Sequence, residues 1–286
     1  MLPESLRGFV LETLELSHLK LELSHLKPNA FVVLGASNVA RGLPRFAAAI
    51  DARNRPSDLF VAAGHGRSYG ANSRVWIRRL PSILHSGLWR ALDREGFAEN
   101  VPATRRLHGL VTDVGNDLLY GFSVEQVAAW VREGVARLAR RQAAIAITRL
   151  PLAAIARVGA IRYRAMRTFY VPTCPLSLAE LKAATIRLDA ALVTIAHDFK
   201  AATIEQPDEW YGLDAMHVRR WHLDGFWQQA FDAWHLEKKA TRPRTSLGRW
   251  ATIGSQAAEV RSLSDRMLFT PQPVVEESAG VSIWMY

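Results

Sequence analysis

Short apolar runs recur along the middle of the chain and predict the strands of a buried sheet. Four clear runs cover residues 31–34, 59–63, 107–111 and 144–147, and a weaker one covers residues 201–204. Mainly apolar runs of this length are typical of strands that are covered on both faces. They therefore predict five strands inside a layered fold.

Amphipathic stretches separate these runs and predict helices on the faces of the sheet. Ser123 and Ser177 each stand three residues before a Gln or a Glu, a spacing typical of the start of a helix. Apolar residues then recur at helical spacing. Strands that alternate with such helices predict a parallel sheet with right-handed crossovers. We therefore expect an α/β fold, a three-layer α/β/α flavodoxin-like sandwich with a mainly parallel five-stranded sheet.

The same pattern divides the chain into three parts. Residues 14–20 and 21–27 both read LELSHLK, and this heptad duplication predicts an amphipathic helix in an N-terminal extension, residues 1–29. The alternation of strands and helices fills residues 30–235 and predicts one domain. The pattern weakens over residues 236–286, where we expect a C-terminal extension that is peripheral or partly flexible.

Composition indicates a globular protein without covalent crosslinks. The chain has 286 residues, 49% of them hydrophobic, which is enough to bury a substantial core. Its single cysteine, Cys174, cannot form an internal disulfide. The N-terminus lacks the pattern of a secretory signal, and no run reaches the roughly 18 apolar residues of a membrane helix. We therefore expect a cytoplasmic protein without a membrane span.

The formal net charge of +9 raises the question of an acidic partner. The arginines are scattered over several predicted helices, so specific nucleic-acid binding is not expected. A group of arginines follows the second strand: Arg67, Arg74, Arg78 and Arg79. They fit either an acidic substrate group or ordinary solvated helix charges, and we favour the second interpretation. The sequence shows no metal-ligand spacing and no phosphate-binding loop, so no metal or cofactor is expected.

Residues suited to chemistry follow the first two strands. Ser37 stands in a Gly-Ala-Ser-Asn turn between a strand and a helix, where a helix N-terminus favours negative charge. It could equally be a helix N-cap. Residues 64–70 contain three glycines, which let the backbone approach a ligand closely. An ordinary loop would have the same composition.

Two later segments complete the set. Asn116 follows the third strand and offers a side-chain amide that suits an oxyanion, although a turn would explain it too. Asp214 and His217 are three residues apart and can meet on one turn. The carboxylate would then orient the imidazole, as in a Ser-His-Asp triad. The alternative is a surface helix that starts at Asp214.

Taken in this order, the four segments resemble the GDSL, or SGNH, hydrolases over residues 30–235. The resemblance implies that Ser37 is the nucleophile, His217 the general base and Asp214 the residue that orients it. It also implies an oxyanion hole made by the Ser37 amide, the Asn116 side chain and one amide of the glycine loop. That amide belongs to Gly64, Gly66 or Arg67, and we favour Gly66. Candidate substrate contacts beside the triad are Asn38, His65, Arg67 and Asp117.

The resemblance has two departures. The residue before Ser37 is alanine where the family has aspartate, and Val218 follows His217 where the family often has proline. The expected function is a serine-dependent ester hydrolase that acts on a small ester or on an acylated carbohydrate or lipid. The same triad would also serve an O-acyltransferase, and the scaffold alone would serve a non-catalytic binding protein.

Overall fold

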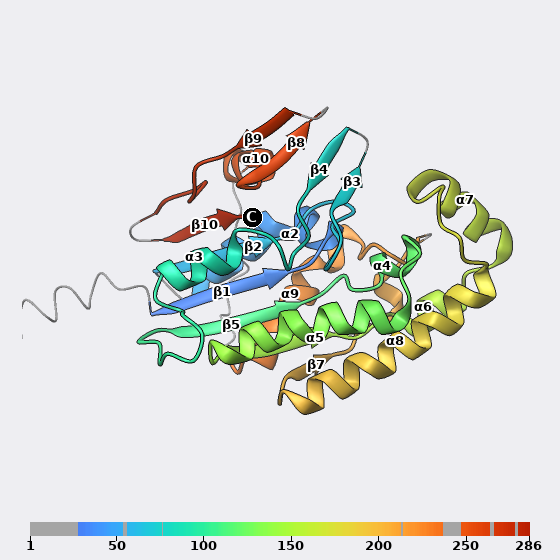
Figure 1. Cartoon of the computed structure of the whole chain (residues 1–286), viewed down its shortest axis with the longest axis horizontal. Helices are drawn as coiled ribbons and strands as arrows, with labels where there is room; N and C mark the ends of the chain where they lie inside the picture. Colours follow the sequence, from blue (N-terminus) through green and yellow to red (C-terminus); the bar gives the residue numbers. More distant parts are fainter. Residues whose placement is uncertain are drawn as a thin grey trace, which may run out of the picture.

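A computed structural model describes residues 28–53, 56–75, 77–212, 214–236, 247–263, 266–277 and 280–286. The heptad duplication of the predicted N-terminal extension lies outside these residues. The central sheet has six strands, all parallel to their neighbours, in the order β10-β2-β1-β5-β6-β7 (Figure 1). They are β1 (Asn29–Leu34), β2 (Ser57–Ala62), β5 (Arg106–Val111), β6 (Ala144–Thr148), β7 (Ala202–Ile204) and β10 (Val281–Met285).

The predicted fold class is confirmed, but the predicted number of strands is wrong. The five apolar runs form β1, β2, β5, β6 and β7, and β10 is the sixth strand. It extends the sheet beyond β2, with Val281 opposite Ser57. Because β10 is far in sequence from the strand it pairs with, the alternation of strands and helices does not reveal it. Within the predicted C-terminal extension, β10 therefore belongs to the central sheet.

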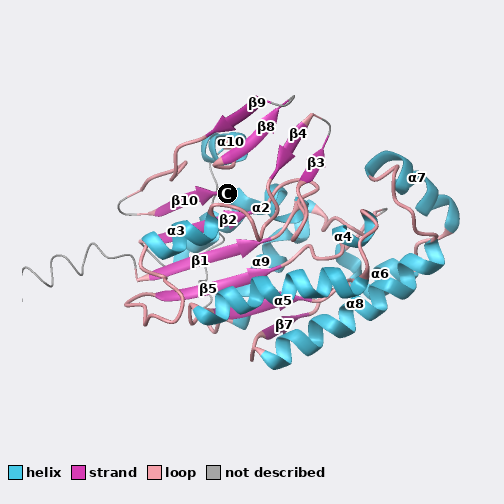
Figure 2. Cartoon of the chain, viewed as in Figure 1, coloured by secondary structure: helices cyan, strands magenta, loops and turns pink. Residues whose placement is uncertain are grey.

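Helices cover both faces of the sheet, as the alternation of side chains along each strand requires (Figure 2). Phe31 and Val33 of β1 pack in one core with α2 (Ser37–Arg53) and α9 (Leu223–Ala233). Ala30, Val32 and Leu34 pack in the other core with α3 (Leu88–Arg94), α5 (Val124–Arg140) and α8 (Leu178–Asp198). The three predicted layers are thus present.

Two of these helices start where the sequence predicts. The Ser123 side chain accepts a hydrogen bond from the Gln126 amide at 3.2 Å at the start of α5. At the start of α8, Ser177 and Glu180 form a complete capping box, with bonds of 2.7 and 3.2 Å.

A second, antiparallel sheet stands beside the first, in the order β3-β4-β8-β9. Its strands are β3 (Ser73–Val75), β4 (Arg78–Leu80), β8 (Val260–Leu263) and β9 (Arg266–Phe269), and α10 (Leu247–Ser255) precedes β8. Arg74, Arg78 and Arg79 therefore lie on strands and not on the helix that we expected. The sequence pattern misses this sheet because its short strands come from two distant parts of the chain.

Two helices between β6 and α8 extend past the end of the sheet, α6 (Leu152–Ala156) and α7 (Ala160–Tyr170) (Figure 1). Tyr163 is the buried residue of α7, whereas Ile161 and Phe169 are 89% and 83% exposed. Together with the short helix α4 (Asn116–Leu119), these helices lie near the carboxyl ends of the central strands (Figure 1). None of the described helices is both long and apolar enough to cross a membrane.

Candidate active site

The candidate site lies where the strand order of the central sheet reverses. β1 pairs with β2 on one side and with β5 on the other, so the loops that leave β1 and β5 diverge at their carboxyl ends. Ser37 begins α2 directly after β1 and is buried. Gly35 permits this tight turn, because a Cβ there would meet side-chain atoms of Val39 and Thr112 at 2.5 and 2.8 Å.

The Asp113 carboxylate, at the end of β5, holds the turn that carries Ser37. Its Oδ2 accepts hydrogen bonds from the amides of Ala36 at 2.8 Å and Asn38 at 3.0 Å. Asp113 has a φ of 57°, a left-handed conformation that is uncommon outside glycine and typical of constrained sites. The Ser37 amide lies between these two amides and has no hydrogen-bond partner among the described residues. It is therefore free to donate to a ligand at the positive end of α2.

The Asn38 side chain joins this turn to the segment that carries His217. Its Nδ2 donates to the Met216 carbonyl at 3.0 Å, and its Oδ1 accepts from the Val218 amide at 2.9 Å. A third bond runs from Nδ2 to Asp113 Oδ1 at 2.7 Å. Because Met216 and Val218 flank His217, the backbones of Ser37 and His217 lie next to each other. In the described part of the chain, no hydrogen bond yet joins the Ser37 hydroxyl to His217.

Asp214 and His217 form the pair that the sequence predicts. His217 Nδ1 lies 3.0 Å from Asp214 Oδ2, and Asp214 Oδ1 accepts from the His217 amide at 2.7 Å. Burial alone would raise the pKa of Asp214, but the hydrogen bonds and charge of His217 outweigh it and hold that pKa below its ordinary value. The carboxylate therefore stays charged and fixes the imidazole through Nδ1, which leaves Nε2 for proton transfer.

The glycine loop after β2 turns tightly at Gly66, which has a φ of +68°. The Arg67 amide donates to the Gly64 carbonyl at 3.1 Å and is thus used within the loop. The Gly66 amide has no partner among the described residues, so it is available where the Arg67 amide is not.

The Arg67 side chain points into the protein. It is 1% exposed and donates to the main-chain oxygens of Ala63 and Tyr286. Burial, with a smaller effect of the Arg78 charge, lowers the pKa of Arg67 to about 9. Arg67 therefore packs the loop against the end of β10, away from a position where it could touch substrate.

Asn116 and Asp117 begin α4 but have different surroundings. Asn116 lines a cavity, and its side-chain amide has no partner in the described chain. Asp117 is 1% exposed, and its Oδ2 accepts from the Tyr69 amide at 2.9 Å. Burial raises the pKa of Asp117 to about 6, although hydrogen bonds from Ser68 and Tyr69 oppose the shift. Asp117 thus ties the glycine loop to α4 and does not face the substrate.

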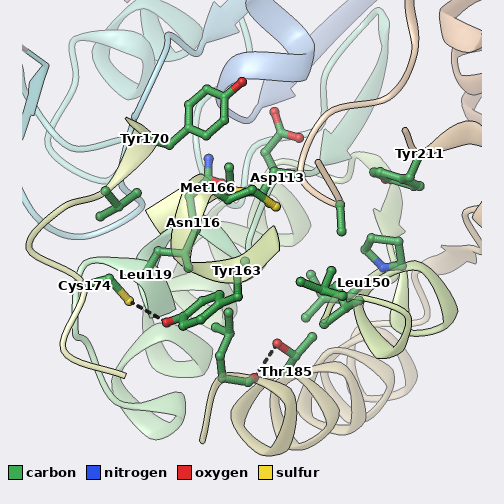
Figure 3. Close-up of a pocket in the computed structure, with 18 of the residues that line it drawn as sticks. Asp113, Asn116, Leu119, Leu150, Tyr163, Met166, Tyr170, Cys174, Thr185 and Tyr211 are labelled. Carbon is green, nitrogen blue, oxygen red and sulfur yellow. Dashed lines mark hydrogen bonds between the residues drawn. The ribbon is translucent and has the colours of Figure 1, made fainter. Parts of the chain in front are cut away.

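The cavity beside Asn116 has a volume of about 100 Å³ and extends under α7 (Figure 3). Asp113 and Asn116 border one end, and Cys174 and Thr185 border the other. The Tyr163 hydroxyl points toward Cys174, at 3.6 Å from its Sγ, and donates to the Leu176 carbonyl at 2.5 Å (Figure 3). The ring of Tyr170, the last residue of α7, lies 5.6 Å from the His217 ring. Most of the remaining lining is apolar: Leu119, Leu150, Ile155, Val158 and Met166.

Sequence reasoning did not find this cavity or the role of Asp113. The lining residues of α7 carry no motif and lie in a stretch without strand or helix-start signals. Asp113 had one visible signal, its place directly after a strand in the same segment as Asn116. The described residues hold no group of three His, Cys, Asp or Glu side chains that could bind a metal ion.

No protein-family model matches this sequence, and no curated protein has significant sequence similarity to it. Among solved structures, the chain is similar to a psychrotrophic esterase, EstA from Pseudoalteromonas sp., in a form inhibited by monoethylphosphonate. The identity is 15%, the match covers 72% of this chain and 97% of EstA, and the TM-score is 0.44. It is also similar to TesA, at 13% identity, with the same coverage and a TM-score of 0.43. Similarity at this level does not assign a function.

Proposed function

We propose that this protein is a serine hydrolase that cleaves carboxylic esters through an acyl-Ser37 intermediate. The observation that carries the proposal is the bonding of Asn38 to both neighbours of His217. This bonding supports the proposal because it joins the turn of the buried Ser37, at the positive end of α2, to the segment that carries Asp214 and His217. A hydroxyl, an imidazole and a carboxylate in this order are the parts of a nucleophile activated by a general base.

The reaction follows from these parts. His217 Nε2 accepts the hydroxyl proton as Ser37 Oγ attacks the ester carbonyl carbon, and the carbonyl oxygen becomes an oxyanion. The tetrahedral intermediate collapses, the bond to the alcohol breaks, and the alcohol leaves with the proton held by His217. Water then attacks the acyl-enzyme and loses a proton to the same imidazole. Release of the acid returns the proton to Ser37.

Three unpaired donors support stabilisation of the oxyanion. They are the Ser37 amide, the Gly66 amide and the Asn116 side-chain amide, each without a partner among the described residues. Fixed donors of this kind stabilise charge that develops in the transition state and need no reorganisation. The apolar cavity beside Asn116 suits the acyl group, because burial of a short alkyl chain there releases water from apolar surface.

The test uses a fluorophosphonate probe and chromogenic esters. We expect the probe to add its mass to the peptide that contains Ser37, and we expect Ser37→Ala to lose labelling and at least ~10³-fold in kcat. Ser123→Ala, which removes only the exposed cap of α5, serves as the control and should keep both. Undiminished labelling or hydrolysis in a folded Ser37→Ala variant would refute the proposal.

A further inference from the structure

Two arginines flank the candidate site on the side opposite the cavity. Arg41 follows Ser37 by four residues on α2, so both lie on one face of that helix. Its Nη1 is buried and makes no hydrogen bond. Arg78 lies on β4, and its Nη2 is 3.8 Å from the position that a Cβ atom on Gly64 would occupy. One guanidinium thus comes from the helix of the nucleophile, and the other lies against the glycine loop.

Neither guanidinium has an acidic partner in the described chain, where neither forms an ion pair or a hydrogen bond. Arg45, one turn further along α2, does pair with Asp224 at 3.3 Å. The nearby carboxylate of Asp113 is already bound to the amides of the Ser37 turn and to Asn38. No carboxylate of the described residues therefore pairs with the guanidinium groups of Arg41 and Arg78.

The pKa of His65, on the glycine loop, agrees with this excess of positive charge. That pKa is lowered, first by desolvation and then by the charges of Arg78, His217 and Arg41. A nearby positive charge disfavours the protonated imidazole, so the direction of the shift fits the positions of Arg41 on α2 and Arg78 beside Gly64.

Arg67 does not contribute to this binding surface, because its enclosed side chain donates to the main-chain oxygens of Ala63 and Tyr286. Arg41 differs, since its Nη1 is buried without a hydrogen-bond partner. A buried guanidinium nitrogen without a partner is destabilising, so an anion bound there would stabilise it. Guanidinium groups also match the planar and tetrahedral oxygens of carboxylate and phosphate.

We infer that the substrate is an ester whose alcohol part carries an anionic group, a phosphate, sulfate or carboxylate, and that Arg41 and Arg78 bind this group. The alcohol part is assigned to this side because the apolar cavity on the other side of Ser37 takes the acyl group. This inference rests on the proposed ester hydrolysis. It reverses our expectation that Arg78 is an ordinary solvated charge.

The test compares two esters that differ in charge but not in shape: 4-butanoyloxybenzenesulfonate and the neutral 4-butanoyloxybenzenesulfonamide. We expect the full-length protein to hydrolyse the sulfonate with a kcat/KM at least ~10-fold higher, and added salt to reduce this preference. Arg41→Gln and Arg78→Gln should each remove most of the preference, mainly through KM. The kcat/KM for the sulfonamide should fall much less than that for the sulfonate in both variants.

Arg45→Gln is the matched control, because it removes a paired arginine from the same helix and should leave both rates unchanged. Thermal unfolding would verify that each variant folds. Equal rates for the two esters, or equal losses on both in the arginine variants, would overturn the inference while the ester hydrolysis stands. Failure of the wild-type protein to cleave either ester would instead overturn the proposed function, and the inference with it.

Discussion

The two sides of Ser37 differ in chemistry. On one side, α6, α7 and α8 enclose an apolar cavity in which the Tyr163 hydroxyl is hydrogen-bonded. On the other side, α2 and β4 present the guanidinium groups of Arg41 and Arg78, for which the described residues supply no acidic partner. Burial of apolar surface is non-directional and tolerant of shape, whereas charge-assisted bonds depend on sign and geometry. Under the proposed function, the acyl half of the substrate would be bound through its apolar surface and the alcohol half through its charge.

Between the two sides lies the catalytic centre that we propose, which contacts the ester bond and not either half of the substrate alone. Ser37 is held there by Asp113, and Asn38 links it to the His217 segment. Variants of this centre should affect all esters alike, whereas variants of one side should affect one half of the substrate. Each of the following predictions tests this separation.

Among variants that keep Ser37, the largest effect is expected for Asn116→Ala. Loss of one oxyanion donor typically costs ~10²–10³-fold in kcat, because the charge that develops on the carbonyl oxygen loses a fixed partner. Steady-state kinetics with short, long, neutral and anionic esters should show the same loss for every substrate. A loss confined to long-chain esters would mean that Asn116 is only part of the cavity wall. Asn72→Ala, on an exposed loop, should leave kcat unchanged.

Asp117 links the glycine loop to α4, and this link should make the stability of the protein depend on pH. The pKa of Asp117 is about 6 in the folded protein and near 3.8 without burial, so the folded state binds the proton more tightly. The stability that this proton provides is complete below pH ~4 and is lost as the pH rises through 6. Between pH 4 and 7.5, the free energy of unfolding of the wild type should therefore fall by up to ~3 kcal/mol relative to that of Asp117→Asn. Urea unfolding at a series of pH values would measure both. A difference that does not vary with pH would contradict this account.

A smaller effect is expected in the cavity. Met166→Trp should fill space under α7 and lower kcat/KM for an octanoyl ester by ~10-fold relative to an acetyl ester, since the longer chain loses its apolar contacts. Ile161→Trp places the same side chain on the exposed face of the same helix and should change neither rate. Equal losses for both esters, or the same loss in Ile161→Trp, would show that α7 does not determine acyl length.

The parts of the fold that follow a local rule could be predicted from the sequence. Five strands are apolar runs, and the candidate residues Ser37 and Asn116 follow strands that lie side by side in a parallel sheet. Asp214 and His217 are close in sequence, so their pairing needs only one turn of chain.

The remaining features depend on contacts between distant segments. Asp113 acts through the amides of the Ser37 turn, 75 residues away at Asn38, and no local pattern records such a bond. The strands of the second sheet are three or four residues long and pair across most of the chain, as Arg78 does with Leu263. The proximity of Arg78 to the glycine loop could not be predicted either, because it depends on the pairing of β4 in the second sheet. In the sequence, Arg41 and Arg78 are only two of many scattered arginines.

The contact between Tyr170 and His217 bears on any attempt to redesign this protein. Because the ring that ends α7 also packs on the imidazole, exchange of the whole helix for one that admits bulkier acids would alter the environment of the base at the same time. Libraries restricted to the first two turns of α7, with Tyr170 retained, would vary the lining of the cavity beside Asn116 and leave the surroundings of His217 unchanged. Acid selectivity and turnover could then be optimised in separate rounds.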